Sequence, residues 1–174
     1  DLVNESLRFE PVPGGYRVVR GGAPLLTDPG TPLPLGDDDS REVALPFAFP
    51  FYGRSFDRVF VNSDGNLTFG EPDPASTPRR VGRLVNGPPR IAPLLTDLDP
   101  SAGGAVTLQA LGDRFVVSWR EIPNFENPLP NTLQAILYPD GRVEITYGTL
   151  NGNADEGVTG IAPGRAEGGV LAVD

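Results

Sequence analysis

The sequence predicts an all-β protein, and two observations carry that prediction. Glycine and proline supply 42 of the 174 residues (22 Gly and 20 Pro) and are spread along the whole chain, so no stretch is long enough for an extended helix. Between these residues, apolar and polar side chains alternate with the period of two that is typical of strands with one buried face. About a dozen such segments predict a two-sheet β-sandwich with long loops rich in Pro and Gly.

Three turns join consecutive strands into predicted hairpins. Asp-Gly or Gly-Asp pairs at 64–65, 112–113 and 140–141 supply the residues that tight turns favour. The paired segments are 57–62 with 66–69, 105–111 with 114–122, and 131–138 with 142–148. In the second strand of the third hairpin, Val143, Ile145 and Tyr147 are expected to share one face. Glu144 and Thr146 are expected on the opposite face.

The remaining strands are predicted at 6–12, 15–20, 42–50, 90–95, 157–162 and 169–173. At this length one domain is expected, covering residues 1–174. It consists of an N-terminal strand pair (1–20), a Pro-rich acidic loop (21–41), and a core with a C-terminal strand (42–174). A second irregular connection is expected at 71–89, which contains five prolines.

The composition removes several kinds of chemistry. The chain has no His, Cys, Met or Lys, so it offers no imidazole base, thiolate nucleophile, Schiff-base amine or P-loop lysine. We therefore expect no enzyme and no cofactor. The net charge of -9 argues against nucleic acid and anionic membranes as partners. No apolar run approaches the roughly 20 residues of a membrane-spanning helix.

The same composition favours an extracellular protein. The chain begins at Asp1 without Met or a basic, apolar leader, so we expect a mature chain whose signal segment has been removed. The absence of Cys and Met removes the side chains that oxidise most readily. The high proline content and the scarcity of thermolabile residue types also suit a heat-stable protein.

Segments in the centre of the chain carry a family resemblance. They are L-P-F-A-F-P-F-Y-G at 45–53, V-F-V-N-S-D-G-N-L-T-F-G at 59–70, I-A-P-L-L-T-D-L-D at 91–99, F-V-V-S-W with I-P at 115–123, N-T-L-Q-A-I-L-Y with D-G at 131–141, and G-V-T-G-I at 157–161. In this order they resemble the nidogen-type extracellular (NIDO) domain of secreted bacterial proteins, over residues 43–163. The second segment is similar to the family's V-x-V-x-S-N-G-x-L-x-F-G.

The resemblance has implications for function, and this sequence also departs from the family pattern at some positions. It implies an extracellular β-sandwich that serves in adhesion, in matrix assembly or as an accessory module, with no catalytic residues to transfer. The family often has an aromatic pair where Leu94-Leu95 stands, and residues 1–42 have no counterpart in the pattern.

Two groups of carboxylates are candidate sites. Asp97 and Asp99, at positions i and i+2 of a strand end, are expected to point the same way, and with backbone carbonyls they could hold Ca²⁺. The alternative is that they cap a turn ahead of Pro100. A hydrolase working through two carboxylates remains a remote alternative, with Asp97, Asp99, Glu121 and Glu126 as candidates and no pair singled out.

The two ends of the chain are candidates for self-assembly. They are apolar and have strand-like patterns, and a terminal strand can complete a neighbour's sheet. The candidate residues are Leu2, Val3, Leu7, Phe9, Val170, Leu171 and Val173. The alternative is that both ends pair within their own domain.

The predicted function is thus a non-catalytic secreted or cell-surface module for adhesion or for self-assembly into an extracellular polymer. The alternative is an accessory domain of a larger secreted protein that binds a glycan or a protein. The expected partners are a second copy of the chain, an extracellular matrix or cell-surface protein, or a glycan.

Overall fold

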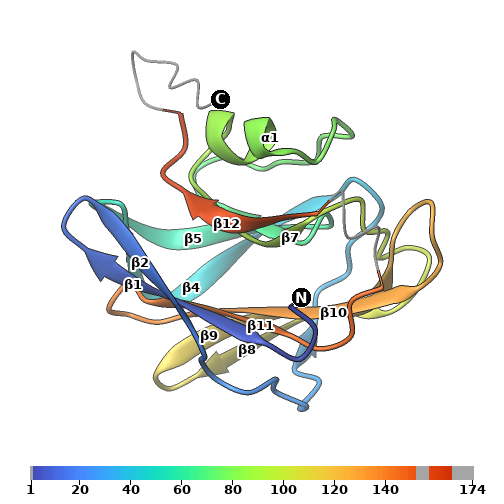
Figure 1. The fold of residues 1–174 in the computed structure, drawn as a ribbon, viewed down its shortest axis with the longest axis horizontal. Helices are drawn as coiled ribbons and strands as arrows, with labels where there is room; N and C mark the ends of the chain where they lie inside the picture. The colour runs from blue at the N-terminus through green and yellow to red at the C-terminus, as the bar shows by residue number, and fades with distance from the viewer. Residues whose placement is uncertain (1, 152–156, 166–174) are drawn as a thin grey trace.

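The computed structural model describes residues 2–151 and 157–165, whose strands form two antiparallel sheets stacked face to face (Figure 1). One sheet has seven strands in the order β2-β1-β11-β10-β9-β8-β3, and the other has five in the order β12-β7-β6-β5-β4. The predicted all-β sandwich is confirmed. The strands are β1 Ser6–Val12, β2 Gly15–Arg20, β3 Thr31–Pro32, β4 Ser40–Phe51, β5 Arg54–Asn62, β6 Asn66–Thr68, β7 Arg90–Leu95, β8 Ala105–Leu111, β9 Arg114–Pro123, β10 Pro130–Leu137, β11 Val143–Tyr147 and β12 Val158–Ala162.

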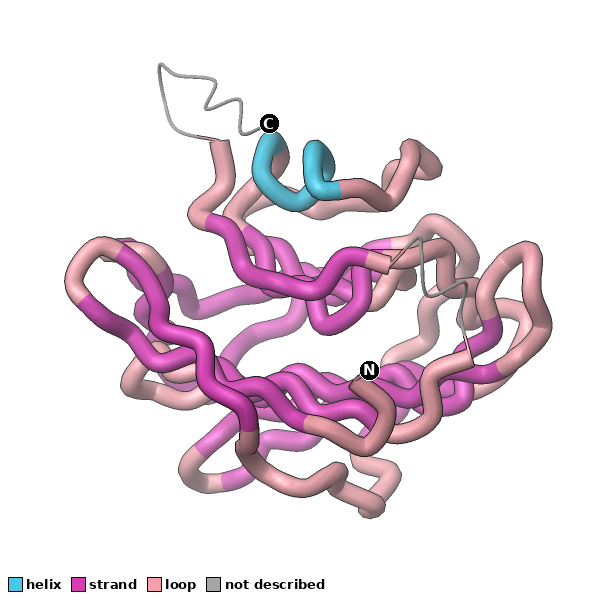
Figure 2. The backbone as a smooth tube through the Cα atoms, in the orientation of Figure 1, coloured by secondary structure: helices cyan, strands magenta, loops and turns pink. Residues whose placement is uncertain are grey.

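The main hydrophobic core lies between the two sheets, which Figure 2 shows as separate layers. Two buried aromatic side chains cross this core with hydrogen bonds. Trp119 on β9 donates from Nε1 to the carbonyl of Asn62 at 3.0 Å, and the hydroxyl of Tyr147 on β11 donates to the carbonyl of Pro93 at 2.8 Å. Both rings are at most 1% exposed. They fix the separation of the sheets and satisfy their own polar atoms, as buried Trp and Tyr require.

The outer face of the seven-stranded sheet is covered by the Pro-rich loop that follows β2. Leu26 exchanges two hydrogen bonds with the side chain of Gln134, and the amide of Ala23 donates to the carboxylate of Glu144 at 2.8 Å. Glu144 and Thr146, which the alternating pattern places on an outward face, are therefore only 4% exposed. The loop also contains the short strand β3, and its last two residues, 40 and 41, begin β4.

The outer face of the five-stranded sheet is covered by residues 70–89, called the cap segment below. The sequence predicts this stretch to be irregular, but it contains the helix α1, Val81–Asn86. The helix lies over the sheet near β12 and β7 (Figure 1). Its Leu84 packs against Ala92, Leu95 and Ala162 of that sheet. The helix occupies the interval between Pro78 and Pro88, which is too short for periodicity to indicate it. No helix among the described residues has the length and hydropathy to cross a bilayer.

Strand boundaries differ from the prediction at one hairpin in particular. β4 and β5 extend to Phe51 and Arg54, which pair directly, so only Tyr52 and Gly53 remain as the turn. Both have positive φ angles, 47° and 76°, as a type I′ turn requires. The Y-G of the resembling motif is therefore a hairpin turn. β6 ends one residue before the predicted boundary, at Thr68.

The N-terminal strand β1 is paired on both sides within its own chain. It lies between β2 and β11, with Phe9 opposite Val18 and Val143. Phe9 is 4% exposed, Leu2 and Leu7 pack against the core, and Val3 is 38% exposed. The other assembly candidates, Val170, Leu171 and Val173, and the predicted strand 169–173 lie outside the described residues.

Candidate functional site

A buried carboxylate lies beneath the cap segment, in the turn between β5 and β6. Asp64 is 1% exposed and accepts hydrogen bonds from two arginines of the cap segment. Arg79 donates from Nε to Oδ2 at 2.9 Å and from Nη2 to Oδ1 at 3.2 Å, and Arg83 Nη1 lies 2.8 Å from Oδ2. Bidentate guanidinium–carboxylate contacts are among the strongest and most directional polar interactions in proteins. This cluster attaches the cap segment to the sheet.

A second carboxylate, Asp73, extends the cluster along the sheet. Its Oδ2 atom lies 3.0 Å from Arg83 Nε and 2.6 Å from Arg90 Nη1. Arg90, which is 1% exposed, also donates to the Oδ1 atom of Asn66 on β6. We call Arg79, Arg83 and Arg90, with Asp64 and Asp73, the arginine network. In this network each buried charge has an oppositely charged partner, which offsets the free-energy cost of removing that charge from water.

Burial and the arginines have opposing effects on these carboxyl groups. Burial raises the pKa of Asp64 to about 6, although Arg79 and Arg83 oppose the shift. Burial also raises the pKa of Asp73, but hydrogen bonds and charges from Arg83 and Arg90 outweigh it and leave this pKa below its ordinary value. Asp64 is thus the network carboxylate that takes up a proton first as the pH falls.

Arg79 also contacts two carboxylates nearer the surface. Its Nη2 atom lies 2.7 Å from Asp38 Oδ1 and 2.8 Å from Asp97 Oδ1. Asp37, Asp38 and Asp97 each offer an oxygen within 4.8 Å of the others, the only such cluster among the described residues. The guanidinium of Arg79 already places a positive charge at two of these three groups. A calcium ion, which prefers six to eight oxygen ligands, would have to compete with it.

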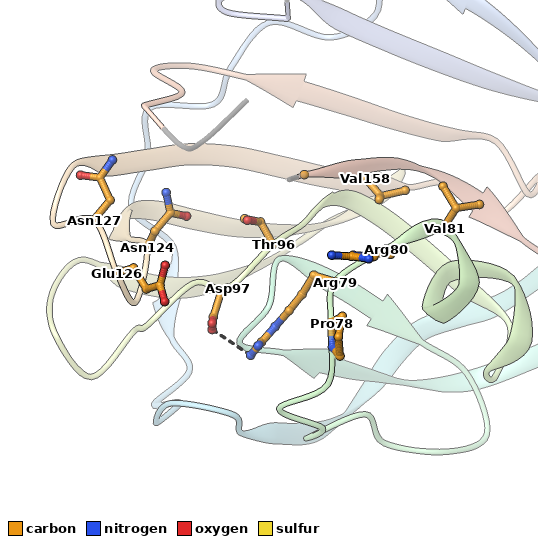
Figure 3. Close-up of a pocket in the computed structure, with 11 residues that line it drawn as sticks. Pro78, Arg79, Arg80, Val81, Thr96, Asp97, Asn124, Glu126, Asn127 and Val158 are labelled. Carbon is orange, nitrogen blue, oxygen red and sulfur yellow. Dashed lines mark ion pairs between the residues drawn. The ribbon is translucent and has the colours of Figure 1, made fainter. Parts of the chain in front are cut away.

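Asp97 and Asp99, the two carboxylates that the sequence singles out, make different contacts. Asp99 accepts hydrogen bonds from the amide and the hydroxyl of Ser101, which is the turn-capping role that the sequence left as the alternative. Asp97 points instead toward Arg79 (Figure 3). Burial raises the pKa of Asp97, the charge of Arg79 lowers it, and Asp38 and Glu126 raise it further, with a net upward shift.

A pocket of about 760 Å³ opens beside this ion pair (Figure 3). Four segments line the pocket. They are the residues leading into α1, the residues that follow β7, the loop after β9 and the start of β12. A cavity of this size falls in the range that holds small ligands. We call it the Arg80 pocket, and it is lined by Pro78, Arg79, Arg80, Val81, Thr96, Asp97, Asn124, Glu126, Asn127, Gly157 and Val158.

Several polar groups in the Arg80 pocket lack partners among the described residues. The guanidinium of Arg80, the hydroxyl of Thr96 and the carboxylate of Glu126 make no hydrogen bond or ion pair there, and the side-chain oxygen of Asn124 is buried without a donor. Of all the arginine side chains in the described residues, only those of Arg20 and Arg80 have no polar or ring contact. Unpaired polar groups that converge on one cavity are typical of a ligand site.

Comparison with known proteins identifies the family. A family model described as NIDO related matches residues 8–173, which is nearly the whole chain. The chain belongs to the NIDO-related family. NIDO-type domains are extracellular, and membership indicates an accessory or structural module. No solved structure is significantly similar to this chain.

The family match extends the resemblance in both directions. It begins at residue 8, so β1 and β2 are part of the NIDO-related domain, although the sequence pattern offered no counterpart for residues 1–42. The structure shows what the S-D-G segment does. Asp64 stands where the resembling pattern has Asn, and the structure buries it against two arginines. That replacement, together with the cap arginines, is the sequence signal for the network.

The sequence candidates divide between the pocket and its surroundings. Asp97 and Glu126 line the Arg80 pocket of the NIDO-related domain, whereas Asp99 and Glu121 do not. Glu121 is exposed and sits at a strand irregularity with a φ angle of 53°. Sequence reasoning missed three of the unpaired pocket residues, Arg80, Thr96 and Asn124. Arg80 is visible as half of the chain's only Arg-Arg pair, but its lack of a carboxylate partner appears only in the folded structure.

Proposed function

We propose that this NIDO-related domain is a non-catalytic adhesion module of the extracellular space, and that it binds its partner through the Arg80 pocket. One observation carries the proposal, the convergence of unpaired polar groups on that pocket. Elsewhere in the described residues the arginines are used in ion pairs, ring contacts or backbone hydrogen bonds, with Arg20 as the other exception. Arg80 and Glu126 are free to contact a ligand.

Three features of the pocket support a non-catalytic role. The chain has no His, Cys or Lys to act as base or nucleophile. The Oδ1 atom of Asp97 lies 2.8 Å from Arg79 Nη2, so this carboxyl group is engaged by a guanidinium, whereas an acid–base hydrolase needs a carboxylic acid that is free to donate a proton to its substrate. Among the described residues of the lining, Glu126 is the one carboxylate that no arginine contacts, whereas a hydrolase of this kind usually needs two carboxyl groups.

The proposal is tested by adhesion to immobilised extracellular materials. Purified chain is applied to a panel of matrix proteins, cell-surface proteins and cell-wall or matrix polysaccharides, as wild type and as Arg80→Ala. The matched control is Arg20→Ala, because Arg20 is the other arginine without a partner. We expect adhesion to at least one material, lost in Arg80→Ala and kept in Arg20→Ala. Equal adhesion by all three proteins to every bound material would contradict the proposal, and so would adhesion to none.

Self-assembly is the second candidate function, and the outer edges of β4 and β12 favour it, since neither edge pairs with another strand of the described residues. An open sheet edge can accept a strand from a second copy. Pro46 and Pro50 interrupt the donors along β4, so β12 is the better edge. Exchange of β1 would require it to leave both β2 and β11. Light scattering over a concentration series supports assembly if the mass rises with concentration, and a monomer at the highest concentration contradicts it.

A further inference from the structure

We propose that the ligand of the Arg80 pocket is a neutral oligosaccharide. This inference rests on the proposed function, because it takes the pocket to be the binding site and specifies the chemistry of what binds. Three properties of the lining carry it: the mixture of donors and acceptors, the balance of charge, and the shape of the apolar surface.

The unpaired groups of the pocket are donors and acceptors in similar measure. Arg80 presents only N–H donors, Glu126 presents only acceptor oxygens when ionised, and the Thr96 hydroxyl can do both. Figure 3 shows Arg80 reaching across the pocket toward Thr96, with Asn124 and Glu126 on the far side. A sugar hydroxyl donates one hydrogen bond and accepts others, so a run of hydroxyls can pair with both sides at once. A ligand with only donors or only acceptors would leave one side unpaired.

The charges of the lining disfavour a ligand with a strong net charge. Among the described residues of the lining, Arg79 and Arg80 balance Asp97 and Glu126, so these residues together carry no net charge. The whole chain carries a net charge of -9, which disfavours the approach of anionic glycans and acidic peptides. A cationic ligand would be attracted by the carboxylate of Glu126 but repelled by the guanidinium of Arg80. A ligand without net charge can use both free charges, and a neutral sugar does so through its hydroxyl groups.

The apolar part of the lining suits a sugar better than a peptide anchor. It consists of Pro78, Val81 and Val158, with Val81 59% exposed, and it contains no aromatic side chain. Peptide and protein partners usually bind through large apolar or aromatic anchors in well-packed pockets, which this shallow surface does not offer. The C–H face of a sugar ring needs only such a small aliphatic surface.

The test is calorimetric titration of the purified chain with oligosaccharides. The neutral series are cello-, chito-, xylo- and manno-oligosaccharides, and the anionic comparison is a heparin-derived oligosaccharide. We expect one neutral series to bind. Arg80→Ala and Glu126→Gln should each weaken it roughly tenfold or more, since each removes a charge-assisted hydrogen bond. Arg20→Ala and Glu5→Gln are the matched controls at exposed positions and should bind like the wild type.

The outcomes separate this inference from the proposed function. If adhesion depends on Arg80 but no neutral series binds, or if a protein or the anionic oligosaccharide binds in the pocket instead, the neutral-oligosaccharide inference is wrong and the adhesion function stands. If a neutral series binds but neither pocket variant weakens the binding, the oligosaccharide does not bind in the Arg80 pocket and the inference is wrong. Thermal unfolding of each variant confirms that the lost binding does not reflect a lost fold.

Discussion

Arg79 and Asp64 form a bidentate ion pair, with Nε 2.9 Å from Oδ2 and Nη2 3.2 Å from Oδ1. Their side chains are 11% and 2% exposed, so the pair is largely shielded from water. It joins the cap segment to the turn between β5 and β6. Because the same guanidinium also holds Asp97, the pair fixes one side of the Arg80 pocket. The fold of the cap and the geometry of the pocket therefore depend on the same contact.

Loss of Arg79 should strongly destabilise the protein. Arg79→Ala leaves Asp64 buried with Arg83 as its remaining cation, and breaking one partner of a buried pair costs about 3 to 5 kcal/mol. Arg79→Lys should recover little, because lysine cannot make the bidentate contact. Denaturant unfolding measures the change. The control is Arg17→Ala, whose salt bridge to Glu10 is exposed and should contribute at most about 1 kcal/mol. An Arg79→Ala variant as stable as the control would contradict this role.

Stability should rise as the pH falls from neutral toward 5. The pKa of Asp64 is about 6 in the folded chain, above its ordinary value of 3.8, so the folded state binds more protons than the unfolded state between these values. The linkage relation then gives a gain of about 1.4 kcal/mol between pH 7.5 and pH 5.0, and the full effect of about 3 kcal/mol is reached only below about pH 4. The lowered pKa of Asp73 opposes this only near and below pH 4.

Urea unfolding at pH 7.5 and pH 5.0 tests this dependence. Asp37 and Asp97 also have raised pKa values, because both are partly buried, so part of the gain belongs to them. The Asp64→Asn variant isolates the contribution of Asp64, since it should show a clearly smaller gain than the wild type. If both proteins gained the same stability, the raised pKa would not belong to Asp64.

Gly65 should not tolerate a side chain. Its φ angle is 65°, and a Cβ atom there would lie 2.3 Å from the backbone carbonyl oxygen of Leu94 on β7. Backbone strain and the clash together predict that Gly65→Ala lowers the free energy of unfolding by about 2 to 4 kcal/mol. The matched control is Gly112→Ala, in a hairpin turn where a Cβ would meet nothing within 4 Å. Equal stability of the two variants would show that the close approach to β7 is not real.

Calcium should have little effect on the protein. Arg79 holds Asp38 and Asp97 with a guanidinium, so the three-carboxylate cluster offers a cation few free oxygens. We expect the melting temperature in millimolar CaCl₂ to equal that in EDTA within about 1 °C, since an ion that does not bind the folded state cannot stabilise it. A clear rise in calcium would show that the ion displaces Arg79.

The sequence predicts the sheets of this domain better than the layers that cover them. Strand alternation and turn residues are local signals, so they indicate the two sheets and three hairpins without a structure. The layers that cover the outer faces of the sheets depend on contacts between residues that are far apart in the sequence. No local pattern reveals that Leu26 bonds to Gln134 or that Leu84 packs against Ala162. Contacts of this kind hold the Pro-rich loop and α1 over the two sheets.

The same distinction applies to the candidate site. Asp97 and Glu126 are candidates from the sequence because they are carboxylates, and both line the Arg80 pocket. Their roles depend on neighbours that come from other segments. Arg79 pairs with Asp97, whereas Arg80, the next residue, faces the pocket without a partner. Two adjacent arginines look alike in the sequence, and only their three-dimensional surroundings separate a structural residue from a binding residue.

The central claim, that the Arg80 pocket binds a neutral oligosaccharide, is tested most directly by NMR titration of the ¹⁵N-labelled chain with the neutral series. The backbone amides of Thr96 and Asn124 and the guanidinium of Arg80 should show saturable shifts, and in Glu126→Gln the same shifts should require a roughly tenfold or higher ligand concentration. Shifts confined to residues outside the pocket, or no shifts with any neutral oligosaccharide, would contradict this claim.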